Sequence, residues 1–270
     1  MQRSVTQHIE GASRVIAVAS GKGGVGKTTV AVNLALALAL DGARVGLFDA
    51  DLYGPNVPLM LGIHQTKSER ATFPVARARR EPYIKPLERY GLKMMSVGLL
   101  VAETDVVQPD PRLVGLFVKQ TLLDVQWGEL DYLLIDLPPG TGEPHQTLIQ
   151  GVFLDGVVVV TTPQDLSLLD AGRSLRLFRQ MGVPILGAIE NMSYLTCPHC
   201  GEPIEVFQRS NRDWAIEGQE VDLLGRIPLD PSISQAINAG HPLMQSAPAS
   251  SGAVVFRAVA KRVAGKFSER

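Results

Sequence analysis

Residues 21–29 form a glycine-rich run suited to binding phosphate: Gly21, Lys22, Gly23, Gly24, Val25, Gly26, Lys27, Thr28 and Thr29. Its glycines let the backbone curl, so that successive N–H groups point into a concave anion-binding surface. The helix expected to follow adds the partial positive charge of its N-terminus. In such a loop we expect Lys27 to reach the β- and γ-phosphates of a nucleotide, and the hydroxyl of Thr28 to bind Mg²⁺.

A second lysine, Lys22, lies near the start of the same run. Because Lys27 already occupies the place where the loop needs a cation, Lys22 requires a separate explanation. Phosphoryl transfer depends mainly on positioning and on neutralising charge. A lysine reaching into a partner subunit would act like an arginine finger, so Lys22 indicates nucleotide chemistry controlled by dimerisation. The alternative is a lysine on a solvated loop.

Three aspartates, Asp49, Asp51 and Asp136, follow or end apolar segments that we expect to be strands. The carboxyl ends of parallel strands share one edge of a sheet, where ligands bind. Carboxylates there bind Mg²⁺, directly or through water, or position the attacking water. The N–H of Gly140, in the loop after Asp136, would sense a γ-phosphate and move when it leaves. For any single aspartate, a turn or helix-cap role is the alternative.

The chain contains two cysteines, Cys197 and Cys200, and two residues separate them. This spacing lets two thiolates face one metal centre. Structural zinc and iron–sulfur clusters normally take four ligands. Either a symmetric dimer supplies two thiolates per chain, or other ligands complete the site. His199 lies inside the turn, where simultaneous ligation is awkward, and two thiols in an ordinary turn are the remaining alternative.

The elements that must position these residues alternate between strands and helices. We expect strands over residues 15–19, 43–48, 131–136, 156–161, 184–189 and 223–227, and helices over 28–40, 167–181 and 251–266. This alternation predicts a doubly wound α/β fold, with a mainly parallel sheet and helices on both faces, of the P-loop NTPase class. We expect a flexible N-terminal segment over 1–12 and one ATPase domain over 13–267. Within that domain we expect an insertion at about 63–90. We also expect a segment at about 192–212 that carries the two cysteines and their two intervening residues, the CxxC segment.

Composition limits the classes of partner. The chain has 270 residues, 45% of them hydrophobic, and a net charge of −1. A near-neutral balance gives no general attraction to nucleic acid or membrane. The sequence lacks an apolar run of about 18 residues that could span a bilayer and an apolar signal core at its start. We therefore expect a cytoplasmic protein with no nucleic-acid partner and no stable membrane association.

Five segments together resemble the Mrp/ApbC-type P-loop ATPases, which belong with the MinD/ParA-like ATPases that carry a deviant Walker A motif. These segments are residues 21–29, 49–55, 136–142, 190–193 and 197–201. The resemblance covers roughly residues 13–265. It implies a homodimer that binds a [4Fe–4S] cluster between its subunits, hydrolyses ATP slowly and passes the cluster to apo-proteins.

The resemblance also implies roles for single residues. By position these are Lys22 as the trans-acting lysine, Lys27 as the P-loop lysine, Thr28 as the Mg²⁺ ligand, Asp51 as the hydrolytic acid, Asn191 as the adenine contact, and Cys197 and Cys200 as the cluster ligands. Two alternatives stay open. One is a MinD/ParA-like positioning ATPase that uses a basic amphipathic helix over 255–267, and the other is a zinc-bridged, nucleotide-dependent dimer.

Overall fold

The structure is a computed structural model that describes residues 6–52, 54–63, 84–100, 110–207 and 215–268. An eight-stranded sheet lies at its centre, in the order β10-β7-β6-β1-β5-β2-β4-β3. The strands are β1 (Val15–Ser20), β2 (Val45–Asp49), β3 (Leu87–Arg89), β4 (Leu92–Ser96), β5 (Tyr132–Asp136), β6 (Gly156–Thr161), β7 (Ile185–Glu190) and β10 (Leu223–Arg226). Neighbouring strands pair in parallel, except for the antiparallel pair β3–β4. The predicted mainly parallel sheet is confirmed.

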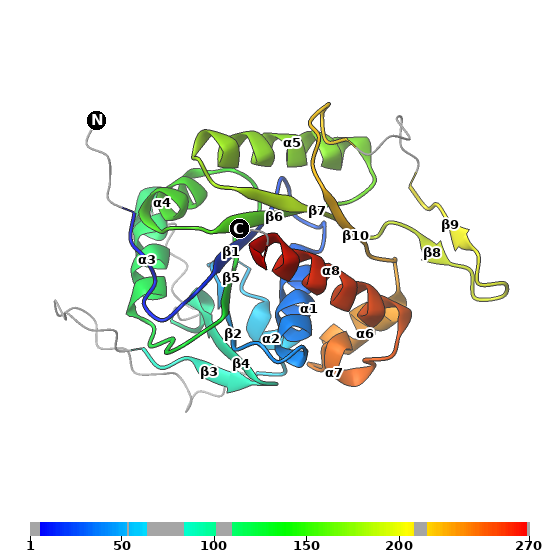
Figure 1. Cartoon of the computed structure of the whole chain (residues 1–270), viewed down its shortest axis with the longest axis horizontal. Helices are drawn as coiled ribbons and strands as arrows, with labels where there is room; N and C mark the ends of the chain where they lie inside the picture. Colours follow the sequence, from blue (N-terminus) through cyan, green and yellow to red (C-terminus); the bar gives the residue numbers. More distant parts are fainter. Residues whose placement is uncertain (1–5, 53, 64–83, 101–109, 208–214, 269–270) are drawn as a thin grey trace.

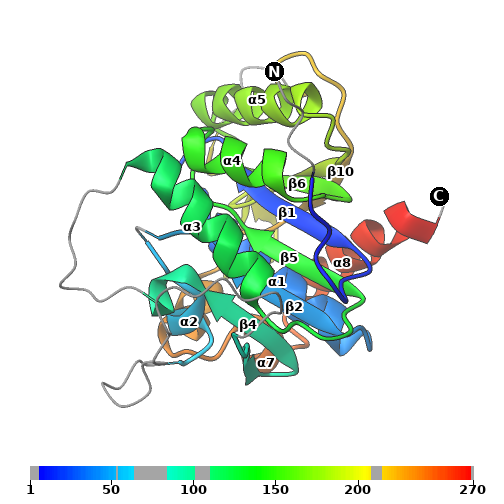
Figure 2. The same cartoon turned by 90° about the vertical axis from the view of Figure 1, so that its left-hand side faces the viewer.

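Helices cover both faces of the sheet (Figures 1 and 2). One face carries α1 (Lys27–Leu40), α2 (Val57–Met60), α6 (Pro231–Asn238), α7 (Leu243–Ser246) and α8 (Ser251–Ser268), and the other carries α3 (Pro111–Asp124), α4 (Glu143–Gly151) and α5 (Asp165–Gln180). The alternation of side chains along β1 divides the core. Ile16 and Val18 pack toward α1, whereas Val15, Ala17 and Ala19 pack toward α5. A strand covered on both faces must be apolar at nearly every position, as β1 is.

The helix α1 is buried along most of its length because it lies between the sheet and α8. Its Ala- and Leu-rich sequence favours a helix that is apolar all round. The helix begins directly after Gly26 and ends at Asp41, whose N–H donates to the Ala37 carbonyl. Gly42, at φ 94°, turns the chain toward β2. The start of α1 is thereby fixed at the carboxyl edge of β1.

The last helix, α8, packs its apolar side against α1 and β10. Phe256, Val259 and Val263 on that side are fully buried. The same apolar residues would have to face the bilayer in the positioning-ATPase alternative. Within the described ranges, no helix combines the length and the apolar character needed to cross a membrane.

The predicted insertion at about 63–90 lies mostly outside the described residues. Of residues 63–90, the stretch 64–83 lies outside the described residues. Residues 84–90 belong to the fold, because Ile84 is buried and bridges to Val125, and β3 pairs with β4. The strand β4, which follows this range and was not predicted, adds Leu92 and Met94 to the core, and the extent of the insertion stays a prediction.

Part of the N-terminal segment over residues 1–12, for which we predicted flexibility, makes contacts with the domain. Gln7 forms a parallel bridge to Val152, and Ala12 forms one to Leu130. Ile9, between them, is buried among apolar side chains. Residues 6–12 therefore lie on the domain, and residues 1–5 lie outside the described part of the chain.

The cysteines lie on a two-stranded hairpin of β8 (Leu195–Thr196) and β9 (Pro203–Ile204). The hairpin projects away from the central sheet, beyond α6 and β10 (Figure 1). It occupies the middle of the predicted CxxC segment over 192–212, of which residues 208–212 lie outside the described ranges.

Candidate functional site

The glycine-rich loop connects β1 to α1 at the carboxyl edge of the sheet. Gly24 and Gly26 have φ values of 80° and 81°, a backbone region that residues with side chains rarely adopt. Gly21 lies against α5, since a Cβ built on it would be 2.1 Å from the backbone oxygen of Asp170. The loop conformation thus depends on glycine at these positions.

Lys27, Thr28 and Asp136 form a connected group at the end of this loop. The Nζ of Lys27 is 2.6 Å from one carboxylate oxygen of Asp136, and the Thr28 hydroxyl donates to the other at 2.7 Å. Asp136 is fully buried and Lys27 nearly so. Burial raises the pKa of Asp136, and the adjacent Lys27 ammonium and Thr28 hydroxyl act in the opposite direction. These hard oxygen donors beside a lysine fit Mg²⁺ and a phosphate chain.

Asp49 lies beside this group, and both of its carboxylate oxygens accept hydrogen bonds from neighbouring residues. One oxygen accepts the Asp51 N–H at 3.1 Å, and the other accepts the Ser96 hydroxyl at 3.0 Å and the Val57 N–H at 3.3 Å. Burial raises the pKa of Asp49 to about 7, and the charge of Asp136 adds to this effect. Asp49 therefore orders the loop that carries Asp51, and its Mg²⁺ role stays a prediction.

Asp51, Lys22 and Gly140 also lie around the glycine-rich loop. Asp51 is half-buried and accepts the Gly54 N–H at 3.1 Å. Lys22 is half-buried, and its carbonyl accepts the Ser20 hydroxyl at 3.0 Å. The N–H of Gly140 donates to the Ser20 carbonyl at 3.2 Å. The structure thus brings the loop after Asp136 against the loop that we expect to hold phosphate.

Asn191 follows β7 and also reaches this loop. Its side-chain Nδ2 donates to the carbonyl of Val25 at 2.8 Å, and its side chain is almost fully buried. A Cβ built on Gly26 would be 2.2 Å from the same nitrogen. The structure gives Asn191 a contact with the loop backbone that the sequence did not reveal, and the adenine contact stays a prediction.

Both cysteines lie in the turn that joins β8 to β9. The Cys197 N–H donates to the Glu202 carbonyl at 2.9 Å, and the Gly201 N–H returns to the Cys197 carbonyl at 2.9 Å. Both thiols are free, with Cys197 half-buried and Cys200 exposed. The backbone N–H of Cys200 and then that of His199 lower the pKa of the Cys197 thiol.

Thiolates are the preferred ligands of zinc and of iron–sulfur clusters, so the donor atoms of the hairpin fit either. In the described part of the chain, no group of three or more His, Cys, Asp or Glu side chains is placed to hold a metal ion. The described residues of one chain therefore offer two thiolates at this turn.

Over residues 11–264, the sequence matches the protein family described as "ParA: NUBPL iron-transfer P-loop NTPase". The chain belongs to this family. The iron–sulfur cluster carrier protein of Synechocystis sp. is 44% identical over 264 residues, which cover 97% of this chain and 73% of that protein. The carrier protein of Pyrococcus furiosus is 42% identical over 94% of this chain and 86% of its own length. That of Escherichia coli K12 is 40% identical, with 96% and 68% covered. The predicted resemblance is confirmed.

Solved structures of P-loop NTPases are similar to this member of the family. A nucleotide-binding protein in complex with ADP from Archaeoglobus fulgidus has a TM-score of 0.70 and 34% identity, covering 86% of this chain and 88% of that chain. The septum site-determining protein MinD of Pyrococcus horikoshii, complexed with Mg-ADP, has a TM-score of 0.67 and 28% identity, covering 93% and 95%. The P-loop NTPase class predicted from the sequence is confirmed.

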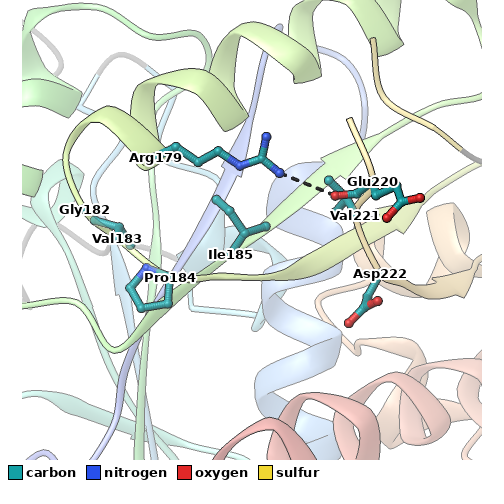
Figure 3. A pocket seen from close by; sticks show the side chains of 8 residues that line it. All are labelled: Arg179, Gly182, Val183, Pro184, Ile185, Glu220, Val221 and Asp222. Carbon is teal, nitrogen blue, oxygen red and sulfur yellow. Dashed lines mark hydrogen bonds between the residues drawn. The ribbon is translucent and has the colours of Figure 1, made fainter. Parts of the chain in front are cut away.

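A hollow of about 840 Å³ lies elsewhere in this P-loop NTPase (Figure 3). It is lined by residues at or just before the starts of β7 and β10, including Pro184, Ile185 and Asp222, and by Arg179 from the end of α5. These strand starts are the amino ends of parallel strands, whereas the glycine-rich loop follows the carboxyl end of β1. The hollow is therefore separate from the candidate nucleotide site.

His145 is a buried residue near Lys27 that sequence reasoning missed. It lies in the first turn of α4, nine residues after Asp136, and is 1% exposed. Its Nε2 has no hydrogen-bond partner in the described part of the chain. Burial, and then the charge of Lys27, lower its pKa to about 4. The one signal for it in the sequence is its place just after the loop that carries Gly140.

We expect His145 to make the NTPase sensitive to acid. The unfolded chain binds a proton to this histidine near pH 6.5, whereas the folded chain resists it until about pH 4. Its contribution is therefore complete above the unfolded pKa and is lost as pH falls toward the folded one. Between neutral pH and about pH 5, we expect a loss of about 2 kcal/mol in the free energy of unfolding.

Urea unfolding of wild type and His145→Leu at both pH values checks this prediction. Because leucine does not titrate, the variant should lose about 2 kcal/mol less on acidification than wild type. Equal acid losses in the two proteins would show that His145 does not carry the effect. Comparison within each protein removes any change in packing that the substitution causes at neutral pH.

Proposed function

We propose that this protein is an ATP-hydrolysing iron–sulfur cluster carrier. In this proposal a homodimer assembles a [4Fe–4S] cluster between its subunits and transfers it to apo-proteins. The observation that carries the proposal is the combination, in one chain, of the Lys27–Thr28–Asp136 group and a hairpin whose N–H groups stabilise the Cys197 thiolate. The carrier names of the relatives support it.

At the nucleotide site, the loop over 21–29 would bind the phosphates of ATP, with Lys27 as their main cation. Thr28 would bind Mg²⁺, with Asp136 and Asp49 holding it directly or through water. Asp51 would orient the attacking water, and Lys22 of one subunit would neutralise charge at the nucleotide of the other. Gly140 would bond the γ-phosphate, exchanging its present bond to the Ser20 carbonyl for that contact.

At the hairpin, Cys197 and Cys200 from two subunits would supply the four thiolates that a [4Fe–4S] cluster takes. Delivery is then an exchange of ligands. Thiolates of the recipient protein replace those of the carrier on iron, and no electron is gained or lost. We further propose that the exchange takes place in the cytoplasm, with no nucleic acid and no stable membrane association.

Anaerobic reconstitution with iron and sulfide, followed by counting both, tests the cluster. We expect about four irons and four sulfides per dimer. Removal of the cluster should also remove the cluster-bridged dimer. A zinc-bridged dimer is the second candidate, because the same two thiolates suit zinc. Zinc at about one ion per dimer, without iron or sulfide after anaerobic handling, would reject the cluster.

Asp51→Ala should separate ATP binding from hydrolysis. The side chain is half-buried beside the nucleotide loop, but the Lys27–Thr28–Asp136 group that we expect to hold the phosphates does not include it. Loss of a group that positions water should lower kcat by about a hundredfold and change the ATP Kd little. Steady-state hydrolysis and direct nucleotide titration measure the two constants.

Asp41→Ala is the matched control, since Asp41 is an exposed aspartate at the far end of α1. It should keep the wild-type kcat. If Asp51→Ala hydrolysed ATP as fast as this control, Asp51 would have no hydrolytic role.

A further inference from the structure

The cysteine-bearing segment begins on the nucleotide loop itself. Its first residue, Asn191, donates from Nδ2 to the Val25 carbonyl at 2.8 Å, and this contact is buried. The terminal carbon of Met192 approaches the same loop, at 3.8 Å from a Cβ built on Gly26. Five residues after Met192, the chain reaches Cys197. A short stretch of backbone therefore separates the loop contact from the first thiol.

The contact controls a group that we expect to bind phosphate. In a trans peptide, the carbonyl of one residue and the N–H of the next point in opposite directions. Because Asn191 holds the Val25 carbonyl on one side, it directs the Gly26 N–H to the other side. A phosphate that binds this N–H must pull on the same rigid peptide unit, and so it acts on Asn191.

The turn that receives this pull is strained and fixed on both sides. Met192 has φ 53°, which is uncommon and strained for a residue with a side chain. The Asn191 N–H donates to the Thr161 carbonyl, and the Ser193 N–H donates to the Ile227 carbonyl, both at 2.8 Å. Because these bonds hold the residues on either side of Met192, a shift of the loop that pulls on Asn191 must be taken up by the backbone of Met192.

Beyond residues 208–214, which lie outside the described ranges, the chain packs on α5, a second element that contacts the glycine-rich loop. Glu217 forms an ion pair with Arg176 of α5 and lies over Gly172 of the same helix. Two residues before Gly172, the backbone of Asp170 lies against Gly21 at the start of the glycine-rich loop. Figure 1 shows the hairpin of β8 and β9 projecting away from the central sheet, beyond β10.

We propose that the turn formed by Asn191 and Met192 is a mechanical joint through which bound nucleotide sets the position of Cys197 and Cys200. The inference rests on the proposed function and adds the positioning residues by which nucleotide would act on the thiols. Asn191 and Met192 act through Val25 and Gly26, without touching the thiols. Nucleotide occupancy and thiol position are then linked, and each changes the other.

The test uses the full-length, metal-free protein under anaerobic conditions. The rate of alkylation of Cys197 and Cys200 by iodoacetamide is measured without nucleotide and with saturating Mg-ADP, at matched oligomeric state. We expect wild type to show a change of about fivefold or more in this rate. Asn191→Asp places a carboxylate, which cannot donate, against the Val25 carbonyl. At saturating Mg-ADP its rate ratio should fall to about one.

A second variant and a matched control make the result decisive. Met192→Gly adopts the positive φ without strain, so it should keep the fold. Because it loses the contact with Gly26, it should reduce the ratio of the alkylation rates with and without Mg-ADP. If Asn191→Asp binds no nucleotide, the alkylation-rate ratio of Met192→Gly tests the proposal in its place. Arg226→Gln removes an exposed group that pairs with Glu190 beside the same turn, and it should keep the wild-type ratio.

Two results would overturn the joint: a wild-type ratio of one with nucleotide bound, or a wild-type ratio in Met192→Gly. Iron counting on the same preparations separates this outcome from the carrier proposal. If wild type binds a cluster and hydrolyses ATP but its alkylation rate does not change with nucleotide, the joint is rejected and the carrier proposal is kept. Wild type that responds to nucleotide but takes up no iron rejects the carrier and retains the joint.

Discussion

Cys197→Ala and Cys200→Ala should each abolish the visible absorption of the reconstituted cluster. In a symmetric dimer, either substitution removes two of the four thiolates, so the loss should be nearly complete rather than partial. The fold should remain intact, because the hairpin lies outside the central sheet and Cys200 is exposed. Absorbance after anaerobic reconstitution measures the cluster, and far-UV circular dichroism with urea unfolding measures the fold.

His199→Ala is the matched control, because it changes the exposed residue between the two thiols and leaves both in place. It should retain iron, sulfide and visible absorption. A cysteine variant with an unchanged cluster spectrum would refute the assignment of the ligands. Loss of the cluster in His199→Ala would instead add an imidazole to the ligand set. The cysteine variants should keep their ATP affinity, since the thiols lie apart from the nucleotide loop.

The sequence was sufficient to predict the carboxyl edge of the sheet. The apolar strands before Asp49 and Asp136, and the strand before the glycine-rich loop, all indicated one shared edge. The structure joins Asp136 to Lys27 and Thr28 there. Parallel pairing of β2 and β5 places Asp49 directly beside Asp136. This prediction succeeded because buried parallel strands are continuous apolar runs that composition reveals.

Elements with weaker local signals were missed, for identifiable reasons. The strand β4, Leu92–Ser96, contains no β-branched residue, so its propensity is low. Its place beside β2 depends on tertiary packing, so the local pattern did not indicate the hydrogen bond from Ser96 to Asp49. The helix α3 carries Gly115 in its interior, which disfavours a helix. A Cβ there would lie 2.7 Å from the Thr147 side chain, so close packing on α4 requires glycine.

Contacts between distant segments were the least predictable part of the site. Asn191 and Val25 are 166 positions apart, and nothing in the local pattern of either indicates that an amide meets a carbonyl there. The same holds for His145, which is buried near Lys27 through the packing of α4. Residue types and spacing predict which groups could do chemistry. The second layer that orients them depends on the assembled fold.

Lys27→Ala should abolish nucleotide binding and also destabilise the protein. The ammonium is the cation that we expect to neutralise the β- and γ-phosphates, so its removal should weaken the ATP Kd by about a hundredfold or more. It is also the ion-pair partner of Asp136 at 2.6 Å, and Asp136 is fully buried. A buried carboxylate left without its cation costs about 3 kcal/mol or more. Nucleotide titration and urea unfolding measure the two effects.

Two further variants separate these effects. Lys27→Ala combined with Asp136→Asn removes the buried charge as well, so it should recover stability without recovering ATP binding. Lys22→Ala removes a lysine from the same loop that has no place in the Asp136 ion pair, and it should keep both stability and ATP affinity while losing hydrolysis. The stability deficit of Lys27→Ala should shrink as pH falls, since protonation of Asp136 removes the uncompensated charge. If the double variant stayed as unstable as Lys27→Ala at every pH, the lysine would support the fold by packing alone, and the Asp136 ion pair would carry none of its stability.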